Sequence, residues 1–313
     1  MYQNKRVLLI AGGGTLGTYA GRTLLEKGCS VDVICLEDHV SDNPRLRYFK
    51  ESATLEMLTG LLQRERYDGI INFLHFPDVE EYKPYHRLLS ANTDHLIFLS
   101  SYRVYADLQH PITESAPMLL DVSQDQEFLE KEDYALAKAR AEYYIRNESG
   151  TTNWTIVRPV ISTSFRRFDL VTRSGKSVLR LVAAGEDVEL PLGAKELTAG
   201  VDWAGNTGKL IANLLFKPEA VGEAFTVSSG QHITWSQVAD IYAELIGARI
   251  RWIDTEEYIR KHTTPSSIWG LIYDRLYERD VDNTKILRVT GLTAKDFLPL
   301  KEGIQIELAS LEE

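Results

Sequence analysis

The sequence predicts an α/β protein built on a doubly wound parallel sheet, with a smaller lobe toward the C-terminus. In the first half of the 313-residue chain, short apolar runs alternate with helical stretches, and a glycine-rich turn follows the first apolar run. The alternation loosens after Arg158-Pro159. Because strands that alternate with helices are joined by right-handed crossovers, they form a parallel sheet with helices on both faces.

The predicted strands of this sheet are near-continuous apolar runs, as burial on both faces requires. They lie at 6–11, 30–36, 69–74, 95–100 and 154–158. The helices predicted between them lie at 15–27, 54–65, 79–91 and 126–148. The chain shows no internal repeats and no low-complexity linker.

The glycine-rich turn has the spacing of a dinucleotide-binding site. Gly12, Gly14 and Gly17 form G-x-G-x-x-G between the first strand and the first helix, and Glu37 follows twenty positions after Gly17. In this Rossmann pattern the three glycines serve, in order, a tight turn, close approach of the pyrophosphate, and helix–strand packing. The N–H groups at the helix start bind phosphate. The predicted cofactor contacts here are Gly12, Gly14, Thr15, Leu16, Gly17 and Glu37.

The second half is predicted to combine the last part of the sheet with the lobe. Residues 160–200 resemble loop with one helix at 176–185, and a strand is expected at 223–228. Further helices are expected at 203–216, 235–247 and 302–311, and residues 255–280 are rich in aromatic and charged side chains. We assign 1–163 and 200–232 to the dinucleotide-binding domain, and 164–199 and 233–313 to the substrate-binding lobe. A lobe over the carboxyl ends of the strands forms a substrate cleft.

Composition restricts the partners. The net charge of −10 argues against nucleic acid or an anionic membrane as the main partner. The two cysteines, Cys29 and Cys35, form no disulfide framework, and the seven histidines show no metal-ligand spacing. No charged-then-apolar leader opens the chain, and no apolar run reaches the length of a membrane span. We expect a cytoplasmic protein without a metal, acting on a small molecule.

Tyr134 and Lys138 form the first candidate catalytic pair. A spacing of four residues places both side chains on one face of a helix. An ammonium beside a phenol favours the phenolate, and such a tyrosine can act as a general acid or base. Ser100 and Ser101 end the fourth apolar strand, and Pro159 ends the next, at the same edge of the sheet. A solvated helix face is the structural alternative for the pair.

Several motifs together resemble the extended short-chain dehydrogenase/reductase family, the NAD-dependent sugar epimerase/dehydratase group. They are the glycine loop, the stretch 98–105 (Phe-Leu-Ser-Ser-Tyr-Arg-Val-Tyr), the Tyr134/Lys138 pair, the stretch 155–159 (Thr-Ile-Val-Arg-Pro) and the stretch 282–285 (Asp-Asn-Thr-Lys). The resemblance implies hydride transfer with bound NAD. It implies that Tyr134 exchanges the hydroxyl proton, Lys138 holds the nicotinamide ribose, and Ser101 hydrogen-bonds the reacting oxygen.

The chain also departs from the family pattern. Ala11 stands at the usual first glycine, although the register from Gly12 also satisfies the motif. Glu37 replaces the usual aspartate; a carboxylate there favours NAD over NADP, although Arg45 and Arg47 leave NADP open. The Thr-Asp-Glu of the family's dehydratases is replaced by the stretch 101–103 (Ser-Tyr-Arg), which disfavours a 4,6-dehydratase. The asparagine that usually follows Arg-Pro is also missing, which weakens the nucleotide-sugar assignment.

Four further residues are candidates for ligand contacts. Asn72 and His75 follow the third strand, where the family's loop lines the cofactor, and a core histidine is an equal alternative for His75. Arg166 and Arg167 enter the lobe and can clamp a substrate diphosphate. A solvated basic pair is the alternative for the two arginines.

The function predicted first is an NAD-dependent epimerase or oxidoreductase acting on a sugar or nucleotide-sugar alcohol. The alternatives are a non-catalytic cofactor sensor or RNA-binding relative, and a reductase of a small ketone. The net negative charge of the chain argues against RNA binding. Relatives commonly dimerise through helices flanking the sheet, which implies a homodimer through 79–91 and 126–148 here.

Overall fold

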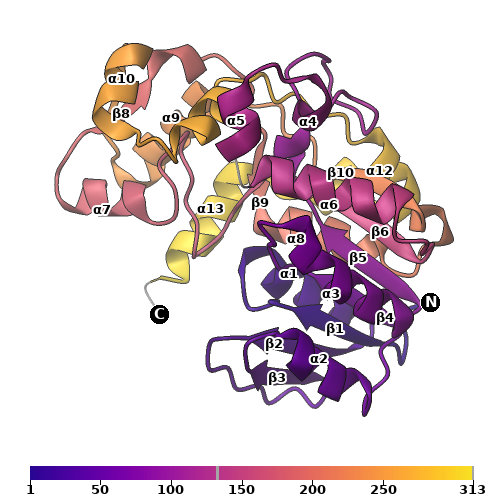
Figure 1. The fold of residues 1–313 in the computed structure, drawn as a ribbon. Coiled ribbons are helices and arrows are strands. Elements are labelled where there is room, and N and C mark those ends of the chain that lie inside the picture. The colour runs from indigo at the N-terminus through magenta and orange to yellow at the C-terminus, as the bar shows by residue number, and fades with distance from the viewer. Residues whose placement is uncertain (132–133, 312–313) are drawn as a thin grey trace.

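The computed structural model describes residues 1–131 and 134–311. Within this part of the chain, seven strands form one parallel sheet in the order β10-β6-β5-β4-β1-β2-β3 (Figure 1). This order confirms the doubly wound sheet predicted from the sequence. The strands are β1 (Arg6–Ile10), β2 (Ser30–Cys35), β3 (Leu46–Lys50), β4 (Gly69–Asn72), β5 (His95–Leu99), β6 (Trp154–Pro159) and β10 (Glu223–Val227).

Helices cover both faces of the sheet because alternate residues of each strand point to opposite faces. On β1, Val7 and Leu9 pack in one buried cluster with side chains of α1 and α8, whereas Leu8 and Ile10 pack in another with α2 and α3. The helices of this domain are α1 (Thr15–Glu26), α2 (Leu55–Leu62), α3 (Val79–Ala91), α6 (Ala135–Asn147), α8 (Ala204–Leu214) and α12 (Thr284–Thr290).

The structure differs from the predictions at several places, of which three show why. The strand β3 was not predicted, because an edge strand with alternating exposed residues carries no long apolar run. The single helix predicted at 126–148 is described as α5 (Gln126–Lys131) and α6, and residues 132–133 lie outside the described part. The stretch 160–200 was predicted as loop with one helix, but it also contains β7 (Ile161–Thr163) and β8 (Val188–Pro191).

The lobe lies beside the carboxyl edge of the sheet, at the upper left of Figure 1. The pairs β7–β9 and β8–β11 are both parallel, and an apolar cluster including Trp235 and Tyr242 fills its interior. Its other elements are α7 (Ser177–Ala183), β9 (Val201–Trp203), α9 (Trp235–Ile246), β11 (Ile250–Ile253), α10 (Thr255–His262), α11 (Ile268–Gly270) and a π-helical turn η4 (Leu271–Arg275).

The chain ends by returning to the sheet domain. α12 packs on α8 and β10, and α13 (Leu300–Ala309) packs on β9. The buried carboxylate of Glu307 accepts hydrogen bonds from Tyr19 of α1, from Trp203 Nε1 at 2.6 Å and from the Phe165 N–H at 2.6 Å. α12, which the sequence placed with the lobe, lies against the sheet domain, whereas α13 contacts both parts, because Leu300 and Ile304 join the apolar cluster of the lobe.

The remaining short elements join these parts. They are η1 (Tyr102–Val104), α4 (Leu119–Val122), η2 (Leu192–Ala194), η3 (Pro218–Ala220) and η5 (Ala294–Asp296). A bilayer-spanning helix, judged by length and apolarity, does not occur among the described residues.

Candidate active site

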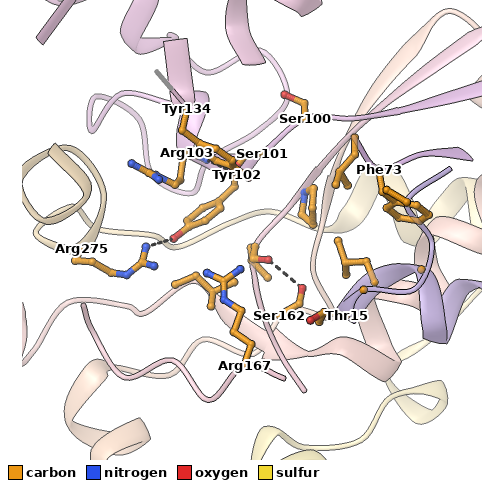
Figure 2. A pocket seen from close by; sticks show the side chains of 18 residues that line it. Thr15, Phe73, Ser100, Ser101, Tyr102, Arg103, Tyr134, Ser162, Arg167 and Arg275 are labelled. Atoms are coloured by element: carbon orange, nitrogen blue, oxygen red, sulfur yellow. Dashed lines mark hydrogen bonds between the residues drawn. The ribbon is translucent and has the colours of Figure 1, made fainter. Parts of the chain in front are cut away.

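A cavity of about 400 Å³ opens at the carboxyl ends of the strands, between the glycine turn and the lobe. Its walls come from the turn after β1, the ends of β5 and β6, the start of α6 and two segments of the lobe (Figure 2). Eight residues that the sequence predicted as site residues line it: Gly14, Thr15, Leu16, Gly17, Ser101, Tyr134, Pro159 and Arg167.

The glycines of the turn have different physical roles. A Cβ on Gly17 would lie 2.3 Å from the Gly12 carbonyl oxygen, so only glycine allows α1 to approach the turn this closely. A Cβ on Gly14 would meet no atom within 4 Å, and Gly14 is the N-cap of α1 without a side-chain cap. The space at Gly14 and the N–H groups of the first helical turn form a cradle suited to a phosphate.

The left-handed residue of the turn is Ala11, with φ of 55°. The sequence interpretation gave the tight turn to Gly12, and this was wrong by one position, since Gly12 is absent from the positive-φ residues. Gly12 instead packs against β1, where a Cβ would lie 2.6 Å from the Leu9 Cβ. Ala11 lines the first cavity.

A second cavity, of about 290 Å³, lies on the other side of the turn and shares Gly17 with the first. Gly12, His39 and Arg166 line it. Glu37 stands at this side, where Arg166 Nη1 donates to its Oε1 at 2.6 Å. This hydrogen bond lowers the pKa of the Glu37 carboxyl. The structure thus places Arg166 beside the predicted ribose-binding carboxylate and apart from Tyr134.

Glu37 also lies near two other possible metal ligands. Ligand atoms of Cys35, Glu37 and His39 fall within 4.8 Å of one another. The carboxylate already pairs with Arg166, and the group occupies the predicted ribose position. We assign no metal to it.

Tyr134 caps the N-terminus of α6 and lines the first cavity. Its ring packs against the His75 ring at 5.1 Å between centroids, and the Arg103 guanidinium lies 5.0 Å from its centroid. The exposed His75 therefore contacts the candidate catalytic phenol from the solvent side. The Lys138 N–H donates to the Tyr134 carbonyl at 3.0 Å, so the pair is one helical turn apart as predicted.

Lys138 is buried behind the cavity wall. Its Nζ donates to the Leu99 carbonyl at 2.7 Å and to the Leu74 carbonyl at 3.2 Å. Burial lowers the pKa of Lys138 to about 7. Leu99 lines the cavity whereas Lys138 does not, so the amine lies behind the edge of β5.

The two serines after β5 have different partners. Ser100 Oγ donates to Glu142 Oε1 at 2.5 Å, and Arg158 donates to the same carboxylate from Nε at 2.9 Å. Ser101 Oγ accepts from the Arg103 N–H at 3.2 Å. Both serines line the first cavity, but the Ser100 hydroxyl is engaged by the buried Glu142 carboxylate, so Ser101 is the better candidate to bind a ligand.

Asn72 ends β4 and is buried. Its Oδ1 accepts from the Leu74 N–H at 3.0 Å, whereas its buried Nδ2 has no hydrogen-bond partner among the described residues. Asn72 does not line either cavity, although its neighbour Phe73 lines the first. It shapes the turn that carries Phe73 and His75.

Among the residues of the first cavity that sequence reasoning did not predict are Tyr102 and Arg275. Tyr102 was quoted only as part of a motif, and Arg275 lies in a stretch characterised only as rich in aromatics and charges. Arg275 Nη1 donates to the Tyr102 hydroxyl at 3.2 Å, across 173 positions of the chain (Figure 2). No local pattern signals a contact over this separation.

Comparisons with known proteins establish the fold. No family model and no curated protein match the sequence. The epimerase Mth375 of Methanothermobacter thermautotrophicus matches with a TM-score of 0.71 at 15% identity, over 98% of this chain and 91% of that one. WbmH of Bordetella bronchiseptica, solved with NAD+, matches with a TM-score of 0.69 at 16% identity, over 99% of both chains.

UDP-glucose 4-epimerase of Thermus thermophilus, solved with NAD, matches with a TM-score of 0.65 at 18% identity, over 97% of this chain and 98% of that one. The chain therefore has the Rossmann α/β fold of these proteins, over nearly their whole length. The similar structures include epimerases, the group that the sequence motifs resemble.

Proposed function

We propose that the protein is an NAD-dependent epimerase or oxidoreductase of the extended short-chain dehydrogenase/reductase family, acting on the alcohol of a sugar or nucleotide-sugar. One observation carries the proposal: Ser101 and Tyr134 line the same cavity as the glycine turn. A hydroxyl and a phenol that face a dinucleotide cradle are the groups needed to hold and exchange an alcohol proton. Three solved epimerases or NAD complexes with this fold support the assignment.

The two cavities fit the two halves of a dinucleotide. They meet at Gly17, so a ligand with its pyrophosphate at Gly14 extends one half toward Tyr134 and the other toward Glu37. Glu37 suits the ribose hydroxyls of NAD, because a carboxylate accepts hydrogen bonds from them and repels a phosphate. NADP is the alternative cofactor, because Arg166 supplies a cation at the same place.

The bound nicotinamide would accept or supply the hydride. Tyr134 takes the alcohol proton or returns it, and the Ser101 hydroxyl donates to the reacting oxygen. Protonated Lys138 has three N–H donors, of which two are directed to Leu99 and Leu74. The third is the one available to a ribose hydroxyl and to the electrostatic support of a phenolate.

The alternatives differ in what happens after the hydride leaves the substrate. In an epimerase the hydride returns to the same molecule, whereas in a reductase of a small ketone it does not. Ser101, Tyr102 and Arg103 stand where a 4,6-dehydratase of this family carries its acid pair, which leaves the dehydratase disfavoured. A sensor is less well supported, because a sensor has no need of a serine, a tyrosine and a lysine gathered at one edge of the sheet.

Two variants test the catalytic and the cofactor parts separately. Tyr134→Phe is expected to abolish hydride transfer at the nicotinamide absorbance in a screen of sugar alcohols, with NAD affinity within about twofold of the original. Gly14→Val is expected to weaken NAD binding at least about tenfold, because its side chain fills the phosphate cradle. Full turnover in Tyr134→Phe would overturn the role of the tyrosine, and unchanged NAD affinity in Gly14→Val would overturn the cofactor site.

A further inference from the structure

Two arginines from separate segments of the lobe line the cavity that contains Tyr134. Arg167 follows β7, and Arg275 ends the π-helical turn η4. In Figure 2 Arg275 approaches the Tyr102 side chain from the left and Arg167 from below, whereas Tyr134 lies above it. The function proposed above uses neither of them.

Buried groups hold both guanidinium groups in place. Arg167 donates from Nε at 2.9 Å and from Nη2 at 2.6 Å to one oxygen of Asp169, whose side chain is fully buried. Arg275 donates from Nε to the Val171 carbonyl at 2.8 Å, and its Nη2 lies 3.6 Å from the same Asp169 oxygen. Asp169 is thus a positioning residue for the two cations.

Several arginines share few carboxylates at this wall. Among the described residues, Asp274 pairs with Arg103, Arg275 and Arg279, and Asp169 pairs with Arg167 and Arg275, so four guanidiniums share these two carboxylates. Burial, together with the charges of Arg103 and Arg167, lowers the pKa of Arg275. Positive charge that is partly withdrawn from water is costly unless an anion joins it.

Arg167 has hydrogen-bonding capacity left. Its Nη1 makes no hydrogen bond with any residue that the structure describes, and 43% of its side chain is exposed. Only 10% of the Arg275 side chain is exposed, and its Nε is hydrogen-bonded to the Val171 carbonyl. Arg275 therefore forms a fixed part of the cavity wall. An anion at Arg167 Nη1 and Arg275 Nη2 would therefore form the end of a bound molecule.

We propose that the substrate is a compact alcohol with an anionic group, a carboxylate or a phosphate, that Arg167 and Arg275 bind while the alcohol faces Tyr134 and Ser101. This inference rests on the proposed function for the identity of the reacting alcohol. The cavity of about 400 Å³ must also receive the nicotinamide, which favours a small acid over a nucleotide-sugar. Guanidinium groups match both carboxylate and phosphate oxygens.

The experiment compares neutral and anionic probes of matched size by calorimetry. The neutral probes are glycerol and glucose; the anionic ones are glycerate, glycerol 3-phosphate, glucuronate and glucose 6-phosphate, and UDP-glucose is the nucleotide-sugar probe. Each is titrated into the protein with and without NAD. Arg167→Met is the test variant, and Arg180→Met, which removes an exposed arginine of α7, is the matched control.

At least one anionic probe is expected to bind about tenfold tighter than its neutral counterpart, with and without NAD. Arg167→Met removes this preference and Arg180→Met keeps it. Whichever series binds more tightly, the carboxylates or the phosphates, identifies the anionic group of the substrate. Equal affinity for neutral and anionic probes, a preference retained in Arg167→Met, or tighter binding of UDP-glucose than of every compact anion overturns the inference. Failure of the proposed function is distinct, because it appears as absent NAD binding while the anion preference remains.

Discussion

Arg166 donates a hydrogen bond to Glu37 at 2.6 Å, although the two residues lie 129 positions apart. The arginine comes from the segment that enters the lobe, and the carboxylate follows β2 of the sheet. The contact therefore ties the lobe to the position where the ribose of a dinucleotide is expected. Both side chains are partly exposed, at 33% and 43%, so the pair itself contributes little to stability.

We expect this pair to control the choice between NAD and NADP. Glu37→Ala is predicted to weaken NAD binding about tenfold, because the ribose loses its carboxylate acceptor, and to strengthen NADP binding, because Arg166 becomes available to the 2′-phosphate. Calorimetry with both cofactors measures the change. Asp38→Ala is the control, because Asp38 pairs with Lys50 and lines neither cavity. An unchanged NAD-to-NADP ratio in Glu37→Ala would contradict the prediction.

Alanine substitutions at Ser100 and Ser101 are predicted to affect different properties, stability in the first case and turnover in the second. Ser101→Ala is expected to lower kcat about a hundredfold with little change in stability, because the proposed mechanism uses the Ser101 hydroxyl to hold the reacting oxygen. Ser100→Ala removes a donor from buried Glu142 and is expected to lower the free energy of unfolding by about 1–3 kcal/mol. Turnover assays and urea unfolding on both variants separate the two roles. The assignment is wrong if Ser100→Ala loses turnover at unchanged stability.

Lys138 is predicted to make stability depend on pH. Burial lowers the pKa of Lys138 to about 7, from an ordinary value of 10.5. Between these two values the unfolded chain binds one proton more than the folded chain, so the free energy of unfolding rises with pH. The contribution approaches about 1.4 kcal/mol per pH unit in the middle of this range, and below about pH 7 the full cost of the buried charge applies.

Urea unfolding at several pH values from about 7 to about 10 tests this prediction. In Lys138→Met the free energy of unfolding is expected to lose the rise with pH that the original chain shows. In Lys131→Met, which changes an exposed position of α5, this rise is expected to remain. A parallel pH profile in Lys138→Met would show that the amine is not titrating in this range.

Ala11 is predicted to be a strained position. Its φ of 55° places a side chain in the left-handed region, which costs an alanine about 1–2 kcal/mol. Ala11→Gly relieves this strain but frees the unfolded chain, so we expect a gain of about 0.5–1 kcal/mol in the free energy of unfolding. Ala91→Gly, at the exposed end of α3, is expected to lose stability. A loss of stability in Ala11→Gly would contradict the argument.

The sheet and its glycine turn were largely predictable, because their signals are local. Five predicted strands of the first half coincide with β1, β2, β4, β5 and β6 within two residues at each end. Apolar runs such as 7–10 are dictated by burial on both faces, and Gly17 is required wherever a helix starts this close to a strand. The edge strand β3 was missed because exposure on alternate residues removes the apolar run.

The candidate site was predictable only where a motif occupies one short stretch. Gly14, Ser101 and Tyr134 each lie in such a stretch, and the structure brings all three to one cavity. Arg166 and Arg167 are neighbours in sequence and were treated alike, yet one pairs with Glu37 and the other with Asp169. Their separation depends on how the lobe packs on the sheet.

By itself, the sequence determined the alternation of strands and helices in the first half, the glycine turn before α1 and the pair of a phenol and an amine one helical turn apart. These features follow from side-chain period and backbone freedom, which act over a few residues. Only the tertiary structure decided that Lys138 is buried against the Leu99 carbonyl and that Arg275 reaches Tyr102. Such contacts join segments far apart in the chain, so they depend on the packing of whole elements, which local patterns do not encode.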